Sequence, residues 1–86
     1  MKTGIPSTIG IQDVDTRRIV DAIVESLVSG KTKGIPSTTT IKDVDLRRSL
    51  DIIIEHIHGG RAGYPAMTTI RDREVKRVLE AVRENI

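Results

Sequence analysis

The side chains in this sequence that could perform chemistry are six acids, two histidines and one glycine-lysine-threonine motif. Carboxylates can bind divalent cations or act as general acids and bases. The six acids form three pairs, namely Asp13 with Asp15, Asp43 with Asp45, and Asp72 with Glu74. Each pair stands where a stretch of helical periodicity begins, and an acid there caps free backbone amides or interacts favourably with the helix dipole. We therefore interpret Asp13, Asp43 and Asp72 as helix caps.

The histidines and the glycine-lysine-threonine motif do not form a site either. His56 and His58 are two residues apart, so on a helix they diverge and make a poor metal-binding pair. Residues 30–32 match the end of a phosphate-binding loop, but that loop needs a glycine where Glu25 stands and must follow a strand. No histidine recurs beside the serines and threonines as a base. The sequence therefore predicts no catalytic residue, no metal site, no cofactor and no enzymatic activity.

The sequence consists of one motif repeated three times. Eleven of fifteen positions are identical between Gly4–Arg18 and Gly34–Arg48, which are thirty residues apart, and Gly63–Arg77 is a more distant third copy. Such a period indicates that each copy is one structural unit. The repeats fill the chain and define a single repeat domain, residues 1–86, with units 3–32, 33–61 and 62–86.

The composition predicts a small, soluble protein with a weak core. The chain has 86 residues, no Phe, no Trp, no Cys and one aromatic residue, Tyr64. A chain of this size buries little surface, so we expect oligomerisation to supply stability. The longest aliphatic run, Ile52–Ile54, is far too short to span a membrane, and the N-terminus has no apolar run typical of a signal peptide. Fourteen basic and twelve acidic residues give a net charge of only +2, so nucleic acid is an unlikely partner.

Each unit is expected to contain one strand and one helix. The extended stretches begin near a proline and are rich in threonine, at residues 4–11, 34–41 and 63–70. The helices that follow should run to about Ser29, His58 and Ile86. Within them, apolar residues recur at steps of four, three and four, which is the heptad stripe of a coiled coil. The stripe consists of Thr16, Val20, Ile23 and Leu27; Leu46, Leu50, Ile53 and Ile57; and Val75, Leu79, Val82 and Ile86.

Two architectures satisfy this pattern. The first is an α+β repeat protein that forms a parallel homotrimer, with these stripes as the interface between chains in short coiled coils. The β-branched residues in the stripes favour more than two strands in such a coiled coil. The alternative is a compact three-helix monomer in which each extended stretch returns the chain for the next helix. We expect the homotrimer, because the chain lacks the aromatic residues that fill a small core.

One basic position recurs in every unit, at Arg18, Arg48 and Arg77. The residue before it is also basic, Arg17, Arg47 or Lys76. These side chains either form a solvated helix face with local ion pairs or contact a partner, since guanidinium groups pair well with carboxylates at interfaces. Nucleic-acid binding through them would lack stacking aromatic residues and is the weaker hypothesis.

The segments TTTIKDVDLRRSLDIIIEHI and TTIRDREVKRVLEAVREN combine a short Thr/Ile-rich stretch with an Asp-capped helix, which in the first segment has the form Asp-x-x-Leu-Arg-Arg-x-Leu. In this respect the chain resembles bacteriophage virion structural and accessory proteins. The resemblance implies a non-catalytic connector of fibre, collar or decoration type, located in the virion and docked on other virion structural proteins. The alternative is a different class of protein, a small monomeric binding module for a protein or nucleic-acid partner.

Overall fold

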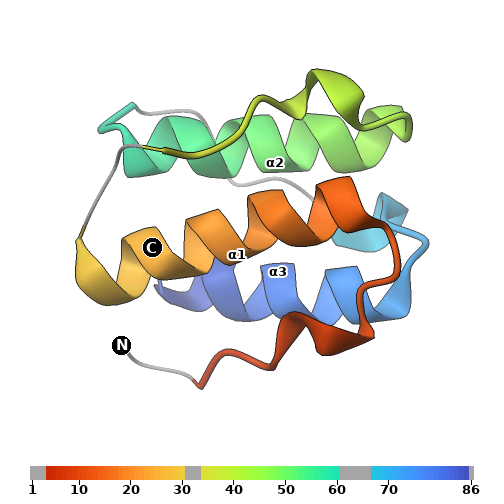
Figure 1. The fold of residues 1–86 in the computed structure, drawn as a ribbon, viewed down its shortest axis with the longest axis horizontal. Coiled ribbons are helices and arrows are strands. Elements are labelled where there is room, and N and C mark those ends of the chain that lie inside the picture. Colours follow the sequence, from red (N-terminus) through yellow and green to blue (C-terminus); the bar gives the residue numbers. More distant parts are fainter. Residues whose placement is uncertain (1–3, 31–33, 61–66, 86) are drawn as a thin grey trace.

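The computed structural model describes residues 4–30, 34–60 and 67–85. Three helices lie side by side and run in the same direction: α1 (Val14–Ser29), α2 (Val44–Ile57) and α3 (Arg73–Asn85) (Figure 1). A short 3-10 turn precedes each helix: η1 (Thr8–Gly10), η2 (Thr38–Thr40) and η3 (Met67–Thr69). Residues 34–43, which carry η2, run back along the bundle to the end at which α1 began, and η3 lies at that same end (Figure 1). The described residues therefore form a parallel three-helix bundle.

The predicted strands are absent from the described residues, so the prediction of an α+β repeat is wrong. The reason is local hydrogen bonding. The Ser7 hydroxyl accepts the backbone N–H of Ile9, and the backbone N–H of Ile11 donates to the Thr8 carbonyl oxygen. The second unit repeats this pattern. Backbone groups that are satisfied within a turn do not form a sheet ladder. Residues 63–66, the start of the third predicted strand, lie outside the described ranges.

An aspartate begins each helix. Its Oδ1 atom accepts the backbone N–H two residues further on at 3.0–3.1 Å, and these residues are Asp13, Asp43 and Asp72. The bond satisfies one of the free amides of the first turn. At the other end, Gly30 follows α1 with a φ of 78°, a left-handed conformation that glycine adopts without strain. Each helix thus begins at a signal that the repeat contains, and α1 also ends at one.

The heptad stripe of each helix forms the core of this single chain. Nine of its residues are buried: Thr16, Val20, Ile23, Leu46, Leu50, Ile53, Val75, Leu79 and Val82. Leu27 and Ile57 are partly buried against the same cluster, and Ile86 lies outside the described ranges. Side chains buried in one chain cannot also form a seam with other chains. The predicted parallel homotrimer with coiled-coil seams is therefore wrong, and the fold agrees with the compact three-helix alternative.

The sequence repeat becomes a pseudo-three-fold arrangement around the bundle axis. The turn η1 packs on α1 and α3, and η3 packs on α2 and α3. The turn η2 packs on its own helix, α2. The isoleucine that precedes each cap is buried at the end where the helices begin, and these residues are Ile11, Ile41 and Ile70. The bundle measures 27 × 23 × 23 Å, so the three units are neighbours around an axis and not segments of a rod.

Candidate interaction surface

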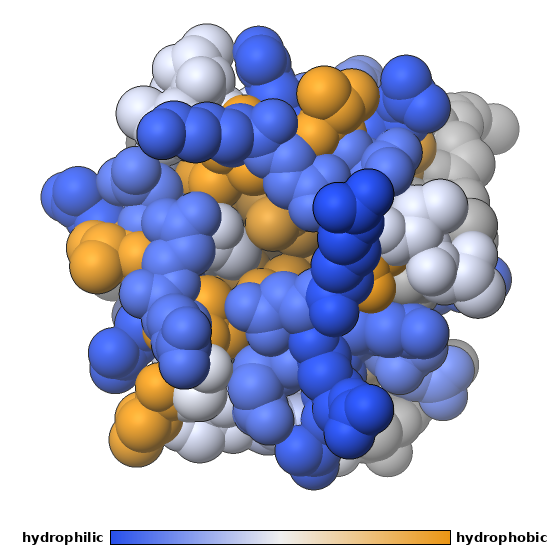
Figure 2. Space-filling view, turned by 90° about the vertical axis from the view of Figure 1, so that its right-hand side faces the viewer, coloured by the Kyte–Doolittle hydropathy of each residue, from blue (hydrophilic) through white to orange (hydrophobic). Residues whose placement is uncertain are grey.

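The parallel arrangement collects positive charge at one end of the molecule. Nine of the ten described lysines and arginines lie within the first five residues of a helix or two residues before it. We call them the basic end surface: Arg17, Arg18, Lys42, Arg47, Arg48, Arg71, Arg73, Lys76 and Arg77. Figure 2 faces this end and shows hydrophilic side chains around apolar atoms near its centre. The tenth described cation, Arg83, lies near the end of α3.

Helix termini do not explain this excess of cations. The three parallel helices point the positive ends of their dipoles toward this surface, where acids are favoured and cations are not. The acids of the repeat meet that preference: each cap aspartate binds a backbone N–H, and a second acid follows two residues later. These six acids are fewer than the nine cations, although Asp21 and Asp51 also lie beside arginines of the surface. The helix dipoles thus account for the acids and not for the cations, and binding of an anionic partner is a role that the cations would suit.

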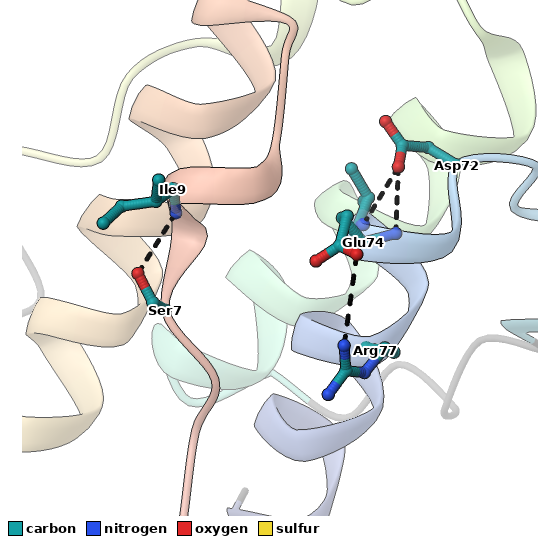
Figure 3. A network of polar contacts seen from close by, with 6 residues as sticks. Ser7, Ile9, Asp72, Glu74 and Arg77 are labelled. Carbon is teal, nitrogen blue, oxygen red and sulfur yellow. Dashed lines mark hydrogen bonds and ion pairs between the residues drawn. The ribbon is translucent and has the colours of Figure 1, made fainter.

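In the first and third units, one arginine of the surface is held by an ion pair. Arg17 Nε lies 3.9 Å from Asp21 Oδ2, and the same aspartate accepts a hydrogen bond from the Thr8 hydroxyl. Arg77 Nη1 lies 4.0 Å from Glu74 Oε2 at the start of α3, beside the η1 segment (Figure 3). Both pairs are solvent-exposed and contribute little to stability. The ion pairs do, however, engage N–H donors of the two arginines that a partner could otherwise bind.

The second unit is different because both arginines at the start of α2 lack an ion pair among the described residues. Asp51 accepts a hydrogen bond from the Thr38 hydroxyl, as its equivalent does in the first unit. Among the described residues, neither Arg47 nor Arg48 has an ion-pair partner. These arginines border a shallow depression of about 400 Å³, lined by Ile41, Lys42, Val44, Arg47, Arg48, Asp51 and Ile52. We call it the α2 depression.

A second depression, of about 630 Å³, lies between the N-terminal segment and α3. Its lining consists of Gly4, Pro6, Arg77, Glu80, Ala81, Arg83 and Glu84. Two cations and two acids are balanced there, and Arg77 also pairs with Glu74. This lining has no preference for one sign of charge, so it indicates no class of ligand.

The three recurring arginines are all exposed at the start of the helices. Arg18, Arg48 and Arg77 occupy equivalent positions on three helices and are exposed. Arg18 and Arg48 have no ion pair among the described contacts, whereas Arg77 has one. Lys42 and Arg71, which directly precede two of the caps, also belong to this surface, although the repeat pattern did not single them out. A signal was present in the sequence, because two of the three units carry a basic residue at this position, where the first unit has Gln12.

The described part of the chain shows no metal-binding cluster of three or more His, Cys, Asp or Glu side chains. Nor does it include a helix with the length and apolar character needed to cross a membrane. His56 and His58 lie at the end of α2, far along the helix from the basic end surface.

Comparison with protein-family models, with curated proteins and with solved structures finds no match to this chain. The resemblance to bacteriophage virion proteins therefore stays a prediction. The basis for a functional proposal is the chemistry of the basic end surface.

Proposed function

We propose that this chain is a small monomeric binding module without catalytic activity, and that it holds an acidic partner protein on the basic end surface. The observation that carries the proposal is that the apolar stripes are buried, whereas most basic residues are exposed. The apolar stripes are buried inside one chain. Arg18, Arg47 and Arg48 are exposed, and the described contacts give them no ion pair. Exposed guanidinium groups without an ion pair are suited to bidentate contacts with the carboxylates of a partner.

A protein fits this surface better than a nucleic acid does. Six carboxylates lie among the nine cations, and they would repel a continuous phosphate backbone. Three large apolar side chains near the same end are also exposed, namely Ile9, Val14 and Val44. Exposed aliphatic groups among charges favour a partner that offers both apolar and acidic side chains. The sequence has one aromatic residue, so it offers no stacking platform for bases.

A structural role in a bacteriophage virion is the other hypothesis, and it rests on the sequence resemblance. As predicted from the sequence, this role would require chains to assemble through the heptad stripes. Those stripes are buried within one chain, so a connector could contact its neighbours only through other surfaces. The monomeric binding module needs only one contact surface, the basic end surface, and we prefer it for this reason.

The proposal is tested by fluorescence anisotropy with a labelled polyglutamate peptide and, in parallel, a labelled DNA duplex. We expect the chain to bind the peptide more tightly than the duplex. Raising the salt from about 50 mM to about 300 mM should weaken peptide binding strongly, because exposed ion pairs are screened. The triple variant Arg18→Glu, Arg48→Glu, Arg77→Glu should abolish binding, whereas Arg83→Gln, distant from the surface, should retain it. Equal binding by the triple variant and the native chain, or tighter binding of the duplex, would contradict the proposal.

A further inference from the structure

The internal repeat allows the three units to be compared at the two adjacent basic positions of each helix, and only in the second unit do both residues lack an ion pair among the described contacts. In the first unit Arg17 pairs with Asp21, and in the third Arg77 pairs with Glu74. In the second unit, neither Arg47 nor Arg48 has an ion pair among the described residues. The second unit therefore presents two neighbouring guanidinium groups that a ligand can bind without first breaking an ion pair.

The second unit also has a more apolar floor than its equivalents. Ile52 is partly buried in the α2 depression, at the position where the other helices carry Ala22 and Ala81. Val44 is 66% exposed at its rim. A few aliphatic carbon atoms are thus accessible between basic groups. A partner side chain that covered them would gain hydrophobic stabilisation in addition to the charge contacts.

The charges around this floor are mostly positive. Lys42, Arg47 and Arg48 line the α2 depression, and Asp51 is its one acid. That acid already accepts the hydrogen bond from Thr38. The first unit has Gln12 in place of Lys42, so the start of α2 carries one more cation than the start of α1. The depression is complementary to at least two negative charges.

We propose that the α2 depression is the specific binding site of the module, and that it takes an acidic peptide segment in which an aliphatic side chain is flanked by carboxylates. This inference rests on the proposed function and names the partner chemistry. The aliphatic side chain lies on the floor formed by Ile52 and Val44. The flanking carboxylates bind the guanidinium groups of Arg47 and Arg48, whose paired N–H donors match the two oxygens of a carboxylate. A volume of about 400 Å³ accommodates one or two aliphatic side chains and not a folded element.

A duplex nucleic acid and an anionic lipid surface are weaker candidates for this site. A phosphate backbone carries no aliphatic side chain to place on the floor, so it would use the cations of all three units alike. A lipid surface would likewise attract the whole basic end surface by charge. A peptide that carries both an aliphatic side chain and carboxylates would use the apolar floor and the guanidinium groups of Arg47 and Arg48 together.

The experiment measures binding of the full chain to three labelled peptides in a Gly/Ser background. The first has one leucine flanked on each side by glutamates, the second has serine in place of the leucine, and the third has glutamines in place of the glutamates. We expect the leucine-glutamate peptide to bind about threefold more tightly than the serine peptide, because part of one aliphatic side chain is buried. The glutamine peptide should show no measurable binding.

Equivalent residues of the first unit supply matched controls. Arg48→Ala is expected to weaken binding of the leucine-glutamate peptide about fivefold, and Arg18→Ala much less, although both arginines are exposed at the same helix position. Val44→Ser should remove the advantage of the leucine peptide. Val14→Ser should leave it unchanged, since Val14 is 67% exposed at the equivalent first helical position. Helicity by circular dichroism verifies that each variant is folded.

The outcomes separate this inference from the proposed function. If the leucine and serine peptides bind equally, and Arg18→Ala weakens binding as much as Arg48→Ala, the α2 depression is not the site. A general acidic-protein module would remain in that case. If no acidic peptide binds, both proposals are wrong. Tighter binding to a DNA duplex or to phosphatidylserine vesicles than to the leucine-glutamate peptide would also overturn the inference.

Discussion

At the scale of single residues, the cap of α1 has a role that the other two caps lack. Thr16 is a polar residue with 0% of its surface exposed, and its hydroxyl donates to Asp13 Oδ2 at 3.1 Å. The other oxygen of Asp13 accepts the backbone N–H of Asp15. The residues equivalent to Thr16 are Leu46 and Val75, which have no polar side-chain atom. Asp13 therefore caps a helix and also satisfies a buried hydroxyl group.

This difference predicts unequal effects of the same substitution. Asp43→Ala should lower the free energy of unfolding by about 1 kcal/mol, the usual effect of losing an N-cap. Asp13→Ala should lower it by a further ~1 kcal/mol or more, because the buried Thr16 hydroxyl loses its acceptor. The measurement is urea unfolding followed by circular dichroism. Thr16→Val in the Asp13→Ala background should recover the difference. Equal losses for the two aspartates would show that the Thr16 bond is unimportant.

At the scale of elements, the packing of η1 on α3 depends on a matched pair of side chains. A Cβ atom on Gly10 would lie 2.7 Å from Glu74 Oε1, which is closer than carbon and oxygen can approach. Gly10 thus leaves room for the longer acid, which also pairs with Arg77 (Figure 3). In the equivalent packing of η3 on α2, the two positions are Thr69 and the shorter Asp45.

The matched pair predicts a rescue. Gly10→Thr should displace the Glu74 side chain and lower the free energy of unfolding by about 1 kcal/mol, at the low end for overpacking because a flexible side chain can move. Adding Glu74→Asp should recover most of the lost free energy of unfolding, since positions 10 and 74 then carry the same residue types as Thr69 and Asp45. A double-mutant cycle by urea unfolding measures the coupling. Additive effects of the two substitutions would show that the residues are not coupled.

The element scale also shows what the sequence could predict. Aspartate caps and the end of α1 followed from local signals, because capping depends on a few neighbouring residues. The strands did not follow, because a Pro-Ser-Thr stretch is compatible with an extended strand and with a 3-10 turn closed by a serine hydroxyl. The lack of an ion pair for Arg47 among the described residues could not be predicted from the sequence either. The helix position of Arg47 is the same as that of Arg17, and only the three-dimensional contacts differ.

At the scale of the whole molecule, the three heptad stripes pack against one another within one chain. The heptad pattern alone is equally compatible with packing between three chains. A parallel bundle requires the chain to return along the bundle between helices, and residues 34–43 do so before α2 (Figure 1). Each helix then directs its stripe toward the same axis. A core of Ile, Val and Leu without aromatic residues is sufficient, because all three units contribute to one cluster. The heptad spacing is identical for seams within a chain and between chains, so it could not decide between them.

The measurement that tests this account most directly is the solution mass by light scattering over a wide range of protein concentration. Since the stripes are buried within one chain, we predict a mass of 9.5 kDa at every concentration, with helicity that does not fall on dilution. A mass of three times this value, or helicity lost on dilution, would show that the stripes pack between chains. That result would contradict the monomeric bundle and the binding module proposed from it.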